Sequence, residues 1–233
     1  MDRVVVTGSF GAVGHDPEKP SDETVPFYPF SPHLPYAFSK NLVEHECLKA
    51  FADGLNVVIA TSCAVLGPHD YKPSRMGRTL IDFANGKLPA YLPGGFEFVA
   101  ARDIVEGHIL AMEKGRSGQK YIFSSQFLTV DEVMDIFEEV TNRDRPSVRI
   151  PSAVMAGVAR VSDFILPRFF PNVPRRFTSG AIRILRMYRH ADISKAKNEL
   201  GYQPTSIKAS IQSAYDDFLR RGLITGSTVV DKN

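Results

Sequence analysis

Three short runs of apolar and β-branched residues predict buried strands. They lie at residues 3–7 (RVVVT), 56–60 (NVVIA) and 120–123 (KYIF). These runs do not alternate with polar residues, which is typical of strands in a parallel sheet covered on both faces. A further short extended segment is expected at residues 96–100.

Between these runs the apolar positions recur every three or four residues and predict helices. The expected helices span residues 36–52, 75–85 and 103–113, and another begins after Thr129, where Thr129 and Glu132 have the spacing of a capping box. The alternation of strands and helices predicts βαβ units. We therefore expect an α/β fold with a Rossmann-like parallel sheet of about three strands.

The pattern changes after residue 150, where prolines separate helical stretches and no comparable strand appears. The helices expected there span residues 152–166, 175–188, 194–200 and 206–221. We therefore divide the chain into two parts. Residues 1–150 form a Rossmann-like part with the catalytic residues, and residues 151–233 form a helical substrate-binding region.

Composition and charge exclude several classes of protein. The 233 residues are 43% hydrophobic, which is enough for a sizeable core. A net charge of +2, from 28 basic and 26 acidic residues, gives no electrostatic footprint for nucleic acid. No apolar run reaches the roughly 20 residues that span a bilayer, and the start has no signal-peptide pattern. With two cysteines and no metal-ligand spacing, we expect a cytoplasmic protein without a bound metal.

The stretch Tyr36-Ala-Phe-Ser-Lys40 carries the first candidate chemistry. Residues at i and i+4 share a helix face, so the Lys40 ammonium would lie beside the Tyr36 phenol. A neighbouring cation favours the phenolate, which makes a tyrosine usable for proton transfer near neutral pH. Ser9 follows the first strand, at the end where ligands bind in open α/β sheets. We expect Ser9, Tyr36 and Lys40 to converge on one cleft as an acid/base set.

Several segments resemble the extended short-chain dehydrogenase/reductases, also called the NAD-dependent epimerase/dehydratase family. They include RVVVTGSFGAVG, PYAFSKNLVEHE, NVVIATSCAVLGPHDYKP and ARDIVEGHILAMEKGRSGQKYIF. The likeness runs from residue 3 to about residue 223 and is nearest to hopanoid-associated sugar epimerases and dihydroflavonol-reductase-like members. It implies an NAD(P)-dependent oxidoreductase or epimerase that acts on a sugar-like or other carbonyl or alcohol substrate.

The resemblance also implies residue roles. Ser9, Tyr36 and Lys40 take the positions of the family's catalytic triad, with Lys40 also holding the nicotinamide ribose. The residues expected to contact NAD or NADP are Tyr36, Lys40, Thr61, Ser62 and Cys63. After the strand that corresponds to residues 56–60, the family typically has Asn-Pro. This chain has Ser62 in place of that proline and so departs from the family's pattern. The residues expected near the substrate are Tyr91, Phe96, Arg186 and Tyr188.

Members of the family begin with a βαβαβ half that holds the glycine-rich cofactor turn. This chain resembles them from their fifth strand onward, so we expect a truncated member that lacks the N-terminal cofactor-binding half. The stretch from Gly8 through Gly11 to Gly14 nevertheless reads TGxxGxxG, the family's dinucleotide fingerprint. The two prolines that follow do not predict the helix that this motif requires. We favour a catalytic strand with a tight turn, and the alternative is a deletion that fused the first strand's turn to the fifth strand.

Three functions remain open on this basis. The chain could be an NAD(P)-dependent enzyme, an inactive truncated fragment, or a cofactor-free domain that uses acid/base groups for cyclisation, isomerisation or dehydration. Loss of the first strands would expose the edge of the strand at 3–7, which favours pairing with another chain. We therefore expect a small-molecule substrate together with a homo-oligomer, or a partner segment that covers this edge.

Overall fold

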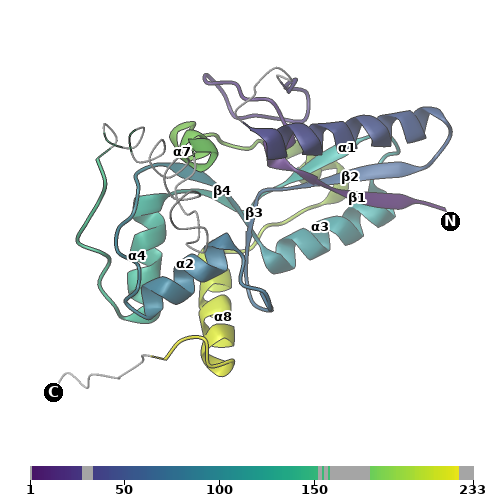
Figure 1. The fold of residues 1–233 in the computed structure, drawn as a ribbon. Coiled ribbons are helices and arrows are strands. Elements are labelled where there is room, and N and C mark those ends of the chain that lie inside the picture. The colour runs from purple at the N-terminus through teal and green to yellow at the C-terminus, as the bar shows by residue number, and fades with distance from the viewer. Residues whose placement is uncertain (1, 28–33, 152–153, 155–156, 158–178, 226–233) are drawn as a thin grey trace.

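The structure, a computed structural model, describes residues 2–27, 34–151, 154, 157 and 179–225 (Figure 1). Its first sheet contains the strands β1 (Val4–Ser9), β2 (Val57–Ser62) and β5 (Lys120–Phe123). The strand order is β1-β2-β5 and both pairs are parallel. This confirms the three-stranded parallel sheet and the α/β fold expected from the sequence.

Two helices cover opposite faces of this sheet, α1 (Pro35–Ala52) on one and α3 (Ala101–Lys114) on the other (Figure 1). The side chains of β2 alternate between them. Val57 packs in a cluster with Cys47 of α1, whereas Val58 packs in a cluster with Ile104 of α3. Burial on both faces explains why the strand is continuously apolar.

A second small sheet contains β3 (Ala64–Leu66), β4 (Gly95–Ala100) and β6 (Gln126–Thr129). β3 pairs with β4 in parallel, and β4 pairs with β6 antiparallel. The sequence predicted only β4, at residues 96–100. β3 and β6 were missed because strands of three and four residues are too short to show a hydrophobic period.

The remaining helices pack on this second sheet or against the first. They are α2 (Arg75–Ala84), α4 (Val130–Thr141), α7 (Ser179–Arg186), the π-helical turn η2 (Ala196–Leu200) and α8 (Ile207–Arg220). The capping box of Thr129 and Glu132 is confirmed at the start of α4. The helix expected at 152–166 lies almost wholly outside the described residues, as does the start of the one expected at 175–188.

Side chains from both parts of the chain build the two main cores. Leu200 and Tyr202 pack with the parallel sheet, and Ile211 and Phe218 of α8 pack with α2 and α4. The division at residue 150 stays a prediction. No helix among the described residues is both long and apolar enough to span a membrane.

Candidate active site at the carboxyl ends of the parallel strands

A cavity of about 720 Å³ lies at the carboxyl ends of β1 and β2. Ser9 and Ser62, the last residues of the two strands, are register partners and both line it. Tyr36 lines the same cavity from the first turn of α1. The structure therefore brings Ser9 and Tyr36 together at the end of the sheet where α/β proteins bind ligands.

The Ser9 hydroxyl is held in place but keeps its proton available. Its Oγ accepts a hydrogen bond of 3.2 Å from the backbone N–H of Gly11 and caps the 3₁₀ turn η1 (Phe10–Ala12). A serine hydroxyl has one donor and two acceptor positions. Ser9 can therefore still donate a hydrogen bond to a substrate oxygen.

Tyr36 stands at the N-terminal end of α1 and is 63% exposed. The helix starts without a side-chain cap from Leu34 and has Pro35 in its first turn, so its positive end lies beside the cavity. The phenol hydroxyl forms no hydrogen bond to any residue that the structure describes. Lys40 lies one turn further along α1 and is not part of the cavity wall.

The segment expected to line the nicotinamide divides between the cavity and the core. Ser62 and Cys63 line the cavity, whereas the Thr61 side chain is completely buried and does not. Burial raises the pKa of the Cys63 thiol, which therefore stays protonated. The Thr61 hydroxyl finds no hydrogen-bond partner in the described part of the chain.

Glu97, which is buried, and Arg189, which is partly buried, are charged residues in the wall of this cavity, and the sequence did not predict either of them there. Burial raises the pKa of Glu97 on β4, although hydrogen bonds from Ser124 and the Ala191 N–H oppose this. Burial lowers the pKa of Arg189 to about 10, so the group remains charged at neutral pH. Arg189 donates to the carbonyl oxygens of Phe10 and Val13, at 2.8 and 2.9 Å.

Arg189 therefore fixes the loop that follows Ser9. Neither charged residue belongs to a motif that a sequence search would find. The nearest predicted residues were Phe96, which adjoins Glu97, and Arg186, which stands three residues before Arg189.

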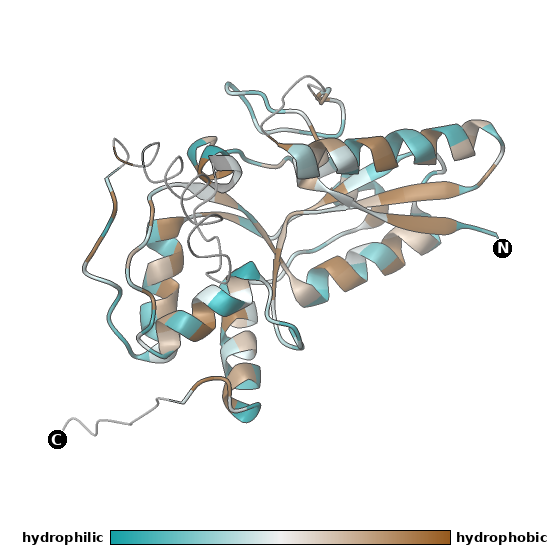
Figure 2. Cartoon of the chain, viewed as in Figure 1, coloured by the Kyte–Doolittle hydropathy of each residue, from teal (hydrophilic) through white to brown (hydrophobic). Residues whose placement is uncertain are grey.

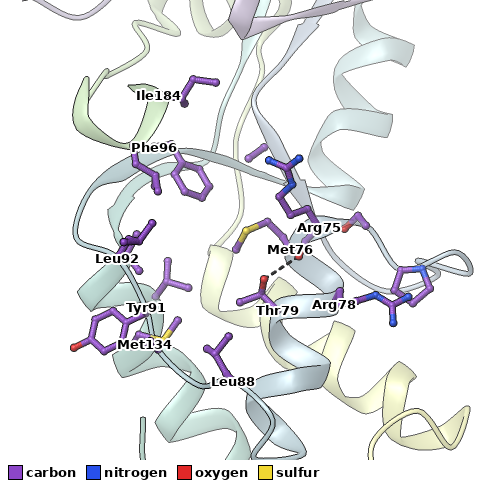
Figure 3. Close-up of a pocket in the computed structure, with 17 residues that line it drawn as sticks. Arg75, Met76, Arg78, Thr79, Leu88, Tyr91, Leu92, Phe96, Met134 and Ile184 are labelled. Carbon is purple, nitrogen blue, oxygen red and sulfur yellow. Dashed lines mark hydrogen bonds between the residues drawn. The ribbon is translucent and has the colours of Figure 1, made fainter. Parts of the chain in front are cut away.

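The four residues expected near the substrate occupy three different places. Phe96 lines the cavity described above and also a second one of about 560 Å³, shown in Figure 3. Tyr91 lines only the second cavity. Arg186 and Tyr188 line neither, and both are exposed.

Gly8 near the end of β1, and Gly11 and Gly14 after the strand, do not form a dinucleotide turn of the usual kind. Only η1, a three-residue turn, follows the strand, and no longer helix begins before α1 in the described residues. A Cβ atom on Gly14 would lie 2.1 Å from the carbonyl oxygen of Pro26, so this glycine packs against another loop. The structure thus favours a strand followed by a tight turn, and the catalytic role of this strand stays a prediction.

The sequence profile of the NAD dependent epimerase/dehydratase family matches residues 1–123. Sterol demethylase protein B of Methylococcus capsulatus is 40% identical over 222 residues, which cover 95% of this chain and 68% of that protein. Among solved structures, gox2253 matches with a TM-score of 0.82 and 28% identity, covering 97% of this chain and 68% of that one.

PA4631, a nucleoside-diphosphate-sugar epimerase from Pseudomonas aeruginosa, matches with a TM-score of 0.79 over 96% of this chain and 68% of that one. At 23% identity it shows a shared fold alone. The chain thus spans about two thirds of the length of these relatives. It belongs to the NAD dependent epimerase/dehydratase family, as its resemblance in sequence predicted.

Proposed function

We propose that this chain carries the catalytic groups of an NAD(P)-dependent oxidoreductase or epimerase that acts at a carbinol or carbonyl carbon. The observation that supports this most is the meeting of Ser9 and Tyr36 at one cavity. In alcohol oxidation, Ser9 hydrogen bonds to the substrate oxygen and Tyr36 accepts its proton. Lys40, one helical turn further along α1, would hold the nicotinamide ribose, as the resemblance to the family implies.

The chemistry that a bound nicotinamide supplies is hydride exchange with the carbinol carbon. The described residues fit the nicotinamide end of such a cofactor, because Ser9, Tyr36 and Ser62 surround open space. They do not fit the pyrophosphate end, because Gly14 packs against Pro26 and no long helix follows the turn. We therefore assign only the nicotinamide end to this chain.

The misfit at the pyrophosphate end favours a second candidate, an acid/base enzyme without a redox cofactor. Titration of the protein with NADH and with NADPH, followed by nicotinamide fluorescence, separates the two. The redox proposal predicts saturable enhancement by at least one cofactor. If the protein is folded and monodisperse but changes the fluorescence of neither NADH nor NADPH, the redox proposal is contradicted and the acid/base proposal is supported.

The substrate proposed here is a small molecule with a carbinol or carbonyl carbon. The name of the 40% identical relative refers to a sterol, and that of PA4631 to a sugar nucleotide. Either compound has a carbinol or carbonyl carbon at which this site could react.

We also propose that the protein is cytoplasmic. Cys47 and Cys63 are both free and buried, which fits a reducing compartment.

We further propose that the protein self-associates through β1 and α1. Among the described strands, β1 pairs only with β2, so its other side is an open edge. α1 turns Asn41 and Glu44 toward the protein, and Leu42 and Leu48 are 47% and 48% exposed. Figure 2 shows apolar patches on this helix beside the apolar strands. An open edge next to exposed apolar side chains favours a contact with another chain.

Sedimentation at micromolar concentration should therefore show a dimer or larger species. Leu42 and Val43 line an apolar groove of about 360 Å³ between α1 and β1. Replacing both by glutamate should give a monomer, because it places two charges in the contact. Val148→Glu, at an exposed position outside the groove, is the control. A wild-type monomer would contradict this proposal.

A further inference from the structure

The second cavity joins the catalytic cavity and is lined almost entirely by hydrocarbon. The two share Ala64, Arg75, Phe96 and Ile184 in their walls. We propose that the second cavity holds the body of the substrate, which is a largely apolar secondary alcohol or ketone of sterol size and not a sugar nucleotide. This inference rests on the proposed function, because it takes Ser9 and Tyr36 as the reacting end.

The described residues that line the second cavity come from several separate parts of the chain. Met76 belongs to α2, Met134 to α4 and Ile184 to α7, and Leu88 and Leu92 lie on the segment that leads to β4. Figure 3 shows the side chains of Met76, Leu88, Leu92 and Met134 around a common space below Phe96, with Ile184 above it. The two methionines can adapt their shape to an irregular apolar ligand. The volume of about 560 Å³ lies within the range of roughly 300–1,000 Å³ that is usual for small-molecule sites.

The polar residues of this wall are already paired or point elsewhere. The Ser74 Oγ accepts from the Gly77 N–H at 3.1 Å, as the cap of α2. The Thr79 hydroxyl donates to the Arg75 carbonyl oxygen at 2.9 Å, drawn as a dashed line in Figure 3. The Arg78 guanidinium extends away from Leu88 and Met134 in the same view. The cavity therefore offers few free hydrogen-bonding groups to a ligand.

This lining discriminates between the two substrate classes. A hydrocarbon body loses contact with water in the cavity, which is favourable. A sugar nucleotide would bring two phosphates and the polar edge of a base against walls that are mostly apolar, and burial of unpaired charge is strongly unfavourable. The charged residues among the described lining are Arg75 and Arg78, which are both exposed, and Arg75 lies where the two cavities join.

The test uses dehydroergosterol, a fluorescent 3β-hydroxysterol, titrated into the protein without a cofactor. We expect saturable binding that UDP-glucose does not displace. Leu88→Arg should raise the dissociation constant at least tenfold, because it puts a charge in the apolar wall. Ile184→Arg should also raise the dissociation constant of the sterol. Because Ile184 is 44% exposed, this variant should fold even if Leu88→Arg does not. Ile109→Arg, at a 46% exposed position of α3 outside both cavities, is the matched control and should bind like the wild type.

Displacement of the sterol by UDP-glucose would overturn the inference. Sterol binding that Ile184→Arg leaves unchanged would also overturn it, and so would a control variant, Ile109→Arg, that weakens sterol binding as much as Ile184→Arg does. Because binding is measured without NAD(P), the result is independent of the proposed redox chemistry. Sterol binding without nicotinamide-dependent turnover would contradict the proposed function and leave the assignment of this cavity standing.

Discussion

Replacing Tyr36 by phenylalanine should lower the rate of alcohol dehydrogenation by about 100- to 10,000-fold, the usual contribution of a positioned acid/base group. The change removes one hydroxyl and keeps the ring. Because the Tyr36 side chain is 63% exposed and its hydroxyl has no partner among the described residues, folding should not change. Steady-state turnover, with thermal unfolding measured alongside, checks both expectations.

Tyr71→Phe is the matched control for this experiment. Tyr71 is 74% exposed and lines neither cavity, so its variant should turn over substrate like the wild type. If the turnover rate of Tyr36→Phe falls less than tenfold, the proton of the substrate hydroxyl is accepted by a group other than Tyr36. Glu97, with a pKa raised by burial in the same cavity, would then be the first group to examine.

Replacing Asp103 by alanine should lower the free energy of unfolding by about 3 kcal/mol, because it leaves buried donors without an acceptor. Asp103 on α3 is 3% exposed. Its carboxylate accepts from the Ser125 hydroxyl at 2.7 Å, and from the Thr205 backbone and hydroxyl at 2.8 Å each. It thereby ties α3 to the segment before α8, far along the sequence.

Urea unfolding at neutral pH measures the effect. Asp103→Asn keeps an acceptor oxygen and should cost less than the alanine variant. Glu106→Ala, an exposed position on the same helix, should change stability by less than about 0.5 kcal/mol. If Asp103→Ala and Glu106→Ala unfold at the same urea concentration, these hydrogen bonds do not stabilise the fold.

The parallel sheet was predictable because burial on both faces leaves a continuous apolar signature. The orientation of α1 was not predictable from its pattern. Its apolar residues recur at helical spacing, but Asn41 and Glu44 are buried, while Leu42 and Leu48 face outward. Glu44 is held in the interior by the Lys120 ammonium at 2.9 Å, from a strand far away in the sequence. A pairing of this kind has no local signal.

In the candidate site, too, residues with a local sequence signal were predictable and residues without one were not. Ser9 ends β1, and Tyr36 stands in the first turn of α1, four residues before Lys40. Glu97 and Arg189 reach the cavity from segments that carry no motif. The apolar cavity escaped prediction for a related reason, since its walls come from α2, α4, α7 and the segment before β4. Only the folded chain brings these surfaces together.

We propose above all that hydride exchange at a carbinol carbon takes place in the cavity lined by Ser9 and Tyr36. The most direct test follows deuterium on that carbon, in the alcohol that the protein turns over fastest, with NAD⁺ or NADP⁺ present. The account predicts that the deuterium appears on the nicotinamide ring and that the ketone product lacks it, as mass spectrometry would show. A product that forms while the deuterium passes to water would contradict it.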